Sequence, residues 1–350
     1  MKCEHNFTRR RLLMQLATWG GGALAASAGV PVELAAQPAR KLIDVHHHVL
    51  PPDWLTTDGT PDVARVFKGW SIAKALEEMD QAGVATGYAS VPIPGRRFNS
   101  DPATARSISR SSNEYMASIR DAHPGRFRMW ALPPMPNVDD SLAEIAYAYD
   151  TLKADGIALF TSYGGKYLGN AVFDPVFAEL NRRNAVVFVH PTAAPCCTDL
   201  QPWIPTAQIE YGTDTTRAIA EYIFNGCTQR FPNVRVIWSH GGGTMPFLVQ
   251  RFINSGQENL KSRVPNGFLA EAKKCWYDTA QVPSKGAMYA LKTIVPASQI
   301  LYGTDYPYRT FQWTEDMLTG DAVFTPREIS GIYRDNVAAV LAGAGKPVPA

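Results

Sequence analysis

Two histidines separated by one residue end a strand-like run early in the sequence, within residues 42–51. Side chains alternate between the two faces of a strand, so His46 and His48 should point the same way and His47 the other way. Two imidazoles on one face, with two prolines close behind them, can clamp one metal ion where a strand meets its loop.

Three further apolar runs end in residues that could share this metal. One ends at His190 before a proline, one at His240 before three glycines, and one at Asp305. Each of these residues stands at the C-terminal end of a β-rich run, just before turn residues. Packing in a core explains one such histidine, but four of the chain's seven histidines hold such a position. The pattern therefore predicts a metal site at strand ends.

The elements that must position these residues alternate along the chain. Strands are expected at residues 42–45, 84–91, 127–132, 156–161, 185–190, 234–240, 275–279 and 299–303. Segments with helical spacing of apolar residues lie between them, at 71–79, 138–154, 174 onward, 213–225, 244–254, 284–293 and 326–342. This alternation predicts an α/β fold, a parallel (β/α)8 TIM barrel, which carries its active site at the C-terminal strand ends. A doubly wound open sheet is the alternative, but no Gly-x-Gly-x-x-Gly follows the first strand.

The first 36 residues are expected to be a twin-arginine-type export signal. Arg9 and Arg10 precede an apolar, Gly/Ala-rich stretch, and residues 26–28 and 34–36 offer small-residue cleavage sites. The stretch is too short and too rich in glycine for a permanent membrane span; a disordered basic N-terminus is the alternative. We therefore expect residues 37–350 to form a single barrel domain in the periplasm, without membrane attachment after processing.

The charge and cysteine content exclude several classes of protein. The whole chain has a formal net charge of +2, and residues 1–36 hold four basic residues against two acidic ones, so the remainder is near neutral. No basic patch argues for nucleic acid. Beyond Cys3, four cysteines are too few for a disulfide framework. The long segment 191–212 favours a lid or a contact between copies in a homo-oligomer, with plain loop variation as the alternative.

Five stretches resemble the amidohydrolase-2 family, in the family's order. They are DVHHH at 44–48, EEMDQAGV at 77–84, VHP at 189–191, SHGGG at 239–243 and YGTDYP at 302–307. They are most similar to its decarboxylase branch, the aminocarboxymuconate-semialdehyde decarboxylases and related aromatic-acid decarboxylases. The stretch FTSYGGKYLGN at 160–170 is similar to one in 6-methylsalicylate decarboxylases. The resemblance implies a barrel of the metal-dependent hydrolase type.

The resemblance also implies roles for single residues. It implies that the metal ligands are His46, His48, His190 and Asp305. It also implies that His240 is the base or proton shuttle. The fourth expected strand contains no lysine that could bridge a second metal, which implies a single ion. Arg65 lies near the place of an arginine that holds a substrate carboxylate in this branch, with an ordinary surface arginine as the alternative. Tyr163 is a candidate for packing against a substrate ring, with an ordinary loop aromatic as the alternative.

Three imidazoles and one carboxylate suit one divalent metal, Zn²⁺ first and Mn²⁺ second. Such a positive site would attract a small aromatic or muconate-like carboxylic acid. Protonation at the carboxyl-bearing carbon, by Asp305 or by a water relayed through His240, would then release CO2. A hydrolase of a lactone, ester or amide would use the same metal and base to activate water. The single metal and the 160–170 stretch favour the decarboxylase, a carbon-carbon lyase.

Overall fold

The computed structural model describes residues 41–52, 54, 61–92, 98, 101–197, 200–201, 203–254 and 258–349. The chain divides into two units, Met1–Arg40 and Lys41–Ala350, and only the second is described below. The expected export signal therefore lies outside the described residues and stays a prediction. Among the helices that are described, none combines the length and the apolar character needed to cross a bilayer.

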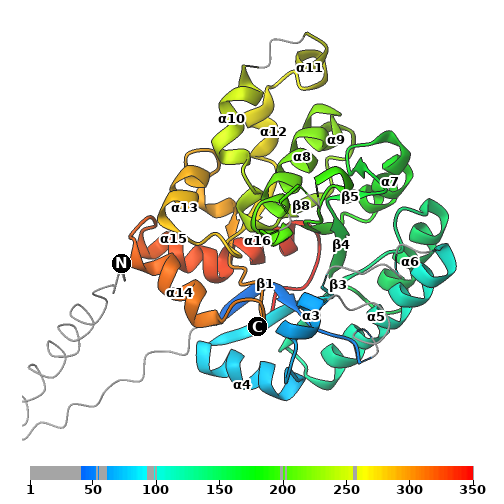
Figure 1. Cartoon of the computed structure of the whole chain (residues 1–350), viewed down its shortest axis with the longest axis vertical. Coiled ribbons are helices and arrows are strands. Elements are labelled where there is room, and N and C mark those ends of the chain that lie inside the picture. Colours follow the sequence, from blue (N-terminus) through cyan, green and yellow to red (C-terminus); the bar gives the residue numbers. More distant parts are fainter. Residues whose placement is uncertain are drawn as a thin grey trace, which may run out of the picture. The chain divides into compact units, whose positions relative to one another are not determined.

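Eight parallel strands form the centre of the second unit, with helices around them (Figure 1). In their order around the sheet they are β1 (Leu42–His48), β2 (Val84–Ser90), β3 (Phe127–Ala131), β4 (Gly156–Phe160), β7 (Val186–His190), β8 (Arg235–Trp238), β9 (Trp276–Asp278) and β10 (Ile300–Leu301). The chain after β10 returns to β1, where the Asp305 amide donates to the His46 carbonyl at 2.9 Å and the His48 amide donates to the Tyr306 carbonyl at 2.7 Å. This closure confirms the eight expected strands and the barrel.

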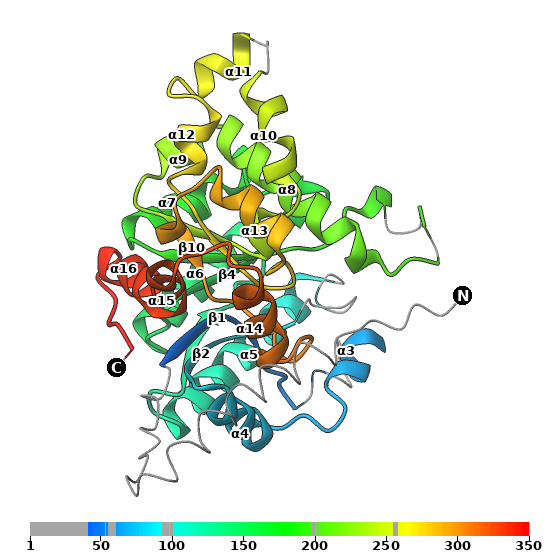
Figure 2. The ribbon, with the colours of Figure 1, turned by 90° about the vertical axis from the view of Figure 1, so that its left-hand side faces the viewer.

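Helices follow the strands and cover the outside of the sheet (Figure 2). The longer ones are α4 (Ile72–Ala82), α5 (Pro102–Ala122), α6 (Val138–Asp150), α7 (Asp174–Arg182), α8 (Glu210–Phe224), α10 (Met245–Ile253), α13 (Lys285–Lys292), α14 (Phe311–Gly320) and α16 (Asn336–Gly343). The expected helix at 326–342 is divided into α15 (Pro326–Ser330), a π-helical turn (Gly331–Asp335) and α16. A short hairpin, β5 (Ser162–Tyr163) with β6 (Lys166–Tyr167), follows β4 and was not expected.

The sequence pattern did not reveal α5, although it has 21 residues. Its buried face includes Ser109, Ser112 and Asn113, so few strongly apolar residues mark that face in the sequence. By contrast, α4 shows clear signals at both ends. The Ser71 hydroxyl accepts from the Lys74 amide at 3.1 Å, and Gly83 ends the helix with a left-handed φ of 73°.

The interior of the barrel is a packed aromatic and aliphatic cluster. Trp130 stacks on Tyr88 with ring centroids 4.2 Å apart, and its indole nitrogen donates to the Val45 carbonyl at 2.9 Å. Val337 and Leu341 of α16 belong to the same cluster, so α16 closes the end of the barrel at which the strands begin. The opposite end, where the strands finish, holds the polar residues described next.

Candidate metal centre

Four buried side chains meet at the C-terminal end of the strands: His46, His48, His190 and Asp305. Their ligand atoms all lie within 4.8 Å of one another. β1 supplies the first two, β7 ends at the third, and the turn after β10 supplies the carboxylate. Asp305 Oδ1 lies 3.2 Å from His46 Nε2 and 3.0 Å from His48 Nε2. The structure thus brings together the four residues that the sequence selected.

His47 points away from this group, as expected, but β1 does not reach this arrangement by simple alternation. The pairing of β1 with β2 shifts register between Asp44 and His47. The His47 ring stacks on Tyr306, with centroids 4.8 Å apart, and Nδ1 lies 3.5 Å from Asp44 Oδ2. His47 is therefore a fully buried part of the packing between β1 and the turn after β10.

Neighbouring groups fix how the histidine rings present their nitrogens. The Pro191 carbonyl lies 2.9 Å from His190 Nδ1 and can only accept, so that nitrogen carries the proton and Nε2 keeps its lone pair. Asp278 Oδ2 accepts from His46 Nδ1 at 2.7 Å, which leaves Nε2 as the nitrogen that faces the other ligands. The Ser90 hydroxyl lies 3.1 Å from His48 Nδ1. Such partners orient imidazoles for metal binding through Nε2.

Asp278 was not among the sequence-based candidates, yet it organises the site. Its Oδ1 accepts from the His240 amide at 2.7 Å and from the Ala280 amide at 3.0 Å, while Oδ2 holds His46. Gly303 permits this approach, because a Cβ there would lie 2.9 Å from the Asp278 Cβ and 3.1 Å from the His46 Cβ. Asp278 ends β9, so the same rule that selected the histidines, a polar residue at a strand end, could have found it.

Burial and nearby charge set the protonation of this group. Burial lowers the pKa of His48, and it lowers the pKa of His190 well below the ordinary value, with the neighbouring histidines adding to the effect on His190. Burial would also lower the pKa of His46, but Asp278 and Asp305 outweigh it and raise that pKa to about 10, so without a metal both ring nitrogens carry protons and an ion would displace the one on Nε2. Burial opposes ionisation of Asp305, but the surrounding histidines hold its pKa well below the usual range. Asp305 is therefore a carboxylate at neutral pH.

The four residues fit a single divalent ion. Nitrogen and oxygen ligands about 2.0–2.2 Å from a tetrahedral ion lie roughly 3.3 Å from one another. His46 Nε2 and His48 Nε2 are 3.2 Å apart, close to that spacing. Asp305 Oδ1 is buried and accepts no hydrogen bond within the part of the chain that the structure describes, so a cation would satisfy it. β4 contains no lysine that could hold a second ion beside it.

His240 lies beside this group rather than in it. Its Nε2 is 3.5 Å from Asp305 Oδ2, and neither ring nitrogen has a hydrogen-bond partner among the described residues. Backbone φ is +52° at His240, a left-handed value that is unusual for a residue other than glycine. Gly243 completes the turn, because a Cβ there would collide with the Gly212 carbonyl. The turn therefore holds the His240 ring next to the Asp305 carboxylate.

A cavity of about 620 Å³ opens beside the site. Its wall is mostly apolar, with Phe98, Met135, Phe160 and Tyr163 among the lining residues and the hydroxyls of Ser162 and Thr192 on one side. The Phe160 ring, which lines the cavity, also contacts His190, with centroids 6.2 Å apart, so one side chain lies between the cavity and a metal ligand. Asp101 is the one charged side chain among the described lining residues. None of the described lining residues therefore offers an anionic ligand a cationic side chain.

Comparisons with known proteins agree with this geometry. The model of the amidohydrolase family matches residues 43–342. The chain belongs to the amidohydrolase family. This amidohydrolase is 35% identical over 284 residues to a 6-methylsalicylic acid decarboxylase of Penicillium expansum, covering 76% of this chain and 84% of that protein. It is 24% identical to a 2-amino-3-carboxymuconate-6-semialdehyde decarboxylase of Dictyostelium discoideum, covering 84% of this chain and 88% of that one.

A solved structure shares the fold of this amidohydrolase. It is a dihydroxybenzoic acid decarboxylase from Polaromonas sp. JS666 with bound manganese and the inhibitor 2-nitroresorcinol. The TM-score is 0.75 at 17% identity, with 87% of this chain and 97% of that chain covered. At this identity the likeness establishes the barrel fold, which the strand pairing shows independently.

The two proposed substrate-binding residues of this amidohydrolase have different positions. Tyr163 is buried against the cavity, and its hydroxyl accepts from the Phe160 amide at 2.8 Å. Arg65 is exposed in the last turn of α3 (Pro61–Val66) and is not among the residues that line the cavity. A role for either side chain in substrate binding stays a prediction.

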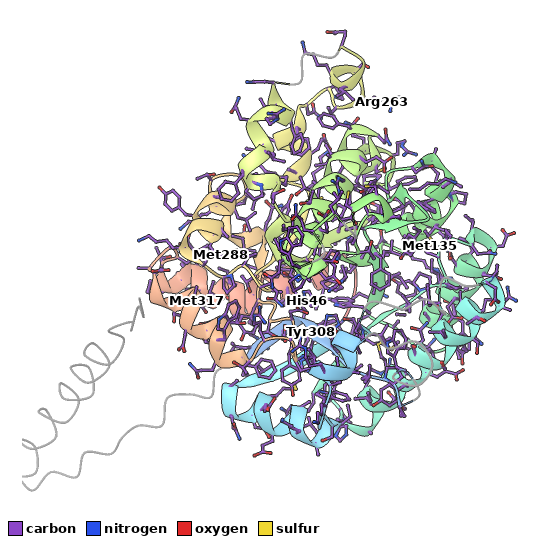
Figure 3. All side chains as sticks on the ribbon, in the orientation of Figure 1. His46, Met135, Arg263, Met288, Tyr308 and Met317 are labelled. Carbon is purple, nitrogen blue, oxygen red and sulfur yellow. The ribbon has the colours of Figure 1, made fainter. Side chains whose placement is uncertain are left out.

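Two further residues of the site had not been expected. Tyr308 lies beside the metal ligands, its ring centroid 5.6 Å from that of His48, and Figure 3 labels it next to His46 near the centre of the view. Gln281 donates from Nε2 to Asp305 Oδ2 at 2.7 Å. Tyr308 stands three residues after Asp305 and could have been found from that motif, whereas no local pattern marks Gln281.

Proposed function

We propose that this chain is a metal-dependent, non-oxidative decarboxylase of an aromatic acid that carries a hydroxyl next to its carboxylate, with 6-methylsalicylate as the model substrate. The observation that carries the proposal is a metal-ligand group that lies next to a largely apolar cavity, with the Phe160 ring in contact with both. The 35% identity to a 6-methylsalicylic acid decarboxylase supports the choice of acid.

We propose zinc as the resident metal, with manganese as the alternative. Three imidazoles and one carboxylate are a common ligand set for zinc. Manganese accepts imidazole and carboxylate as well, and it is bound in the fold neighbour from Polaromonas. An ion here would polarise an oxygen substituent of the bound acid and offset its negative charge.

The cavity accounts for how the acid would be oriented. A ring with an apolar substituent can pack against Phe160, Tyr163 and Met135. Because the described lining residues include no arginine, lysine or histidine, the anionic groups of the acid are drawn toward the metal-ligand end. Among these described residues no cation holds the carboxylate in place, so none of them opposes the loss of CO2 through a salt bridge.

The side chains next to that end would supply the proton. Asp305 is ionised, because its pKa is held well below the usual range, so it must receive a proton before it can donate one. His240, with Nε2 3.5 Å from Asp305 Oδ2, is the ring placed to exchange that proton. The bond between the ring carbon and the carboxylate breaks, its electron pair forms the new carbon–hydrogen bond, and CO2 leaves. General acid catalysis of this kind contributes about 10²–10⁴-fold.

A substrate panel tests the proposal. Purified protein loaded with zinc or manganese is incubated with 6-methylsalicylate, other hydroxybenzoates, aminocarboxymuconate-type acids and simple aryl lactones, while CO2 and ring-opened acids are measured. We expect CO2 from an ortho-hydroxybenzoate, and we expect both His240→Ala and Asp305→Asn to lose that activity. Lactone opening with no CO2 from any acid would instead identify a hydrolase.

A further inference from the structure

Three strained backbone positions meet at one oxygen atom of the site. Six described residues other than glycine have a positive φ, and three of them are His240 at 52°, Gln281 at 61° and Asp305 at 63°. The side chains of His240 and Gln281 both lie beside Oδ2 of Asp305. Left-handed backbone in residues other than glycine is costly and concentrates where function requires a special geometry.

The two oxygens of Asp305 have separate environments. Oδ1 faces the imidazoles, 3.2 Å from His46 Nε2 and 3.0 Å from His48 Nε2. Oδ2 accepts from Gln281 Nε2 at 2.7 Å and lies 3.5 Å from His240 Nε2. Because an amide nitrogen can only donate, Gln281 holds Oδ2 on the His240 side of the carboxylate.

The Asp278 carboxylate anchors both His240 and the turn that carries Gln281. Asp278 Oδ1 accepts from the His240 amide at 2.7 Å and from the Ala280 amide at 3.0 Å, directly before Gln281. Asp278 Oδ2 meanwhile holds the His46 ring at 2.7 Å. The turn after β9 is therefore anchored to the same group that orients a metal ligand, which explains how Gln281 is kept in its left-handed conformation.

We propose that Gln281 is a positioning residue that fixes the orientation of the Asp305 carboxylate. In this orientation Oδ1 faces the imidazoles of the metal ligands, and Oδ2 exchanges a proton with His240 and the substrate. This inference rests on the decarboxylation proposed above. Without the amide, the carboxylate can rotate so that both oxygens face the imidazoles, and the oxygen needed for the proton is lost. Gln281 acts through Asp305 and does not itself receive a proton.

Three variants separate the amide from the backbone. Gln281→Met keeps the length of the side chain and removes the donor, and Gln281→Gly removes the side chain but relieves the left-handed backbone. Gln299→Met is the matched control, because Gln299 Nε2 donates to the Cys275 carbonyl at 2.9 Å just before β9, away from the site. Metal content, metal affinity, melting temperature, kcat and KM are measured for all three.

We expect kcat to fall about 10–100-fold in both Gln281 variants, the range typical for partners that orient metal ligands. KM should change little, metal affinity should not decrease, and Gln281→Gly should melt no lower than the wild type. Gln299→Met should have a lower melting temperature than the wild type and an unchanged kcat. Unchanged kcat in Gln281→Met would overturn the proposal, and so would a loss of kcat explained entirely by lost metal.

The proposal can also be tested if no substrate is found. Crystal structures of the metal-loaded wild type and Gln281→Met would show the orientation of the Asp305 carboxylate directly. We expect Oδ2 to turn toward the metal only in the variant. An unchanged carboxylate would refute the role of Gln281, whereas failure of the substrate panel would refute the proposed decarboxylation and leave this structural result standing.

Discussion

Replacing Asp278 by Asn should weaken metal binding although Asp278 itself is not placed as a ligand. In the wild type, Oδ2 accepts from His46 Nδ1 at 2.7 Å, so Nδ1 keeps its proton and Nε2 is the nitrogen that gives up its proton to bind the ion. An Asn amide that points its nitrogen at His46 would donate to Nδ1 instead. The ring proton would then move to Nε2, where it blocks coordination.

Turning the Asn amide the other way does not rescue the site. Its nitrogen would then face the His240 and Ala280 amides, which now donate to Oδ1 at 2.7 Å and 3.0 Å. Donors would oppose donors in a group that is fully buried. Partners of metal-binding histidines typically contribute 10–100-fold to metal affinity. At about 1.4 kcal/mol for each factor of ten, we expect a loss of roughly 1.4–2.8 kcal/mol in binding free energy.

The assay is a competition titration of zinc and of manganese with a fluorescent chelator, together with metal analysis after dialysis. Asp155→Asn is the matched control, because Asp155 is a buried carboxylate beside β4 that accepts from the Met129 amide at 3.1 Å and from Arg128 at 3.0 Å, with no metal ligand among these partners. It should lower the melting temperature and leave metal affinity unchanged. Wild-type metal affinity in Asp278→Asn would refute the reasoning about the His46 tautomer.

Four other variants have distinct expected outcomes. His46→Ala should remove metal and activity together, whereas His47→Ala should keep the metal but unfold more easily by about 2–4 kcal/mol, because a fully buried ring is lost; metal analysis and denaturant titration distinguish them. Tyr163→Phe should cost about 1 kcal/mol through loss of one buried hydrogen bond, measured by the same titration, and an unchanged stability would contradict that contact. Changing Arg9 and Arg10 to Lys should stop export, measured by cell fractionation, and continued export would exclude the twin-arginine proposal.

Strand ends could be predicted from sequence because they combine two signals, an apolar β-rich run and a polar residue before turn residues. His190 and His240 show both signals, and in a barrel all such positions face one end. The expectation for His47 was correct for a reason that the sequence does not contain. A register shift in β1 and stacking on Tyr306, more than simple alternation, place that ring in the packing.

Contacts between segments far apart in the chain could not be predicted in this way. Gln281 reaches Asp305 because a left-handed turn directs its amide there, and no local propensity favours that conformation for glutamine. The buried polar face of α5 similarly conceals a long helix, since Asn113 pairs with Leu132 and Glu144 rather than joining an apolar stripe. Both the position of Gln281 and the buried face of α5 depend on hydrogen bonds between side chains and groups that are distant in the sequence.

The central claim is that this site replaces a carboxylate by a proton on an aromatic ring. The most direct measurement is turnover of 6-methylsalicylate labelled with ¹³C in the carboxyl group, carried out in D2O with the metal-loaded protein. We predict labelled CO2 in equal amount to a phenol that carries one deuterium at the carbon that held the carboxylate, with neither product formed by Asp305→Asn. Full recovery of the labelled acid from the active, metal-loaded protein, together with hydrolysis of a lactone or amide at the same site, would contradict the account.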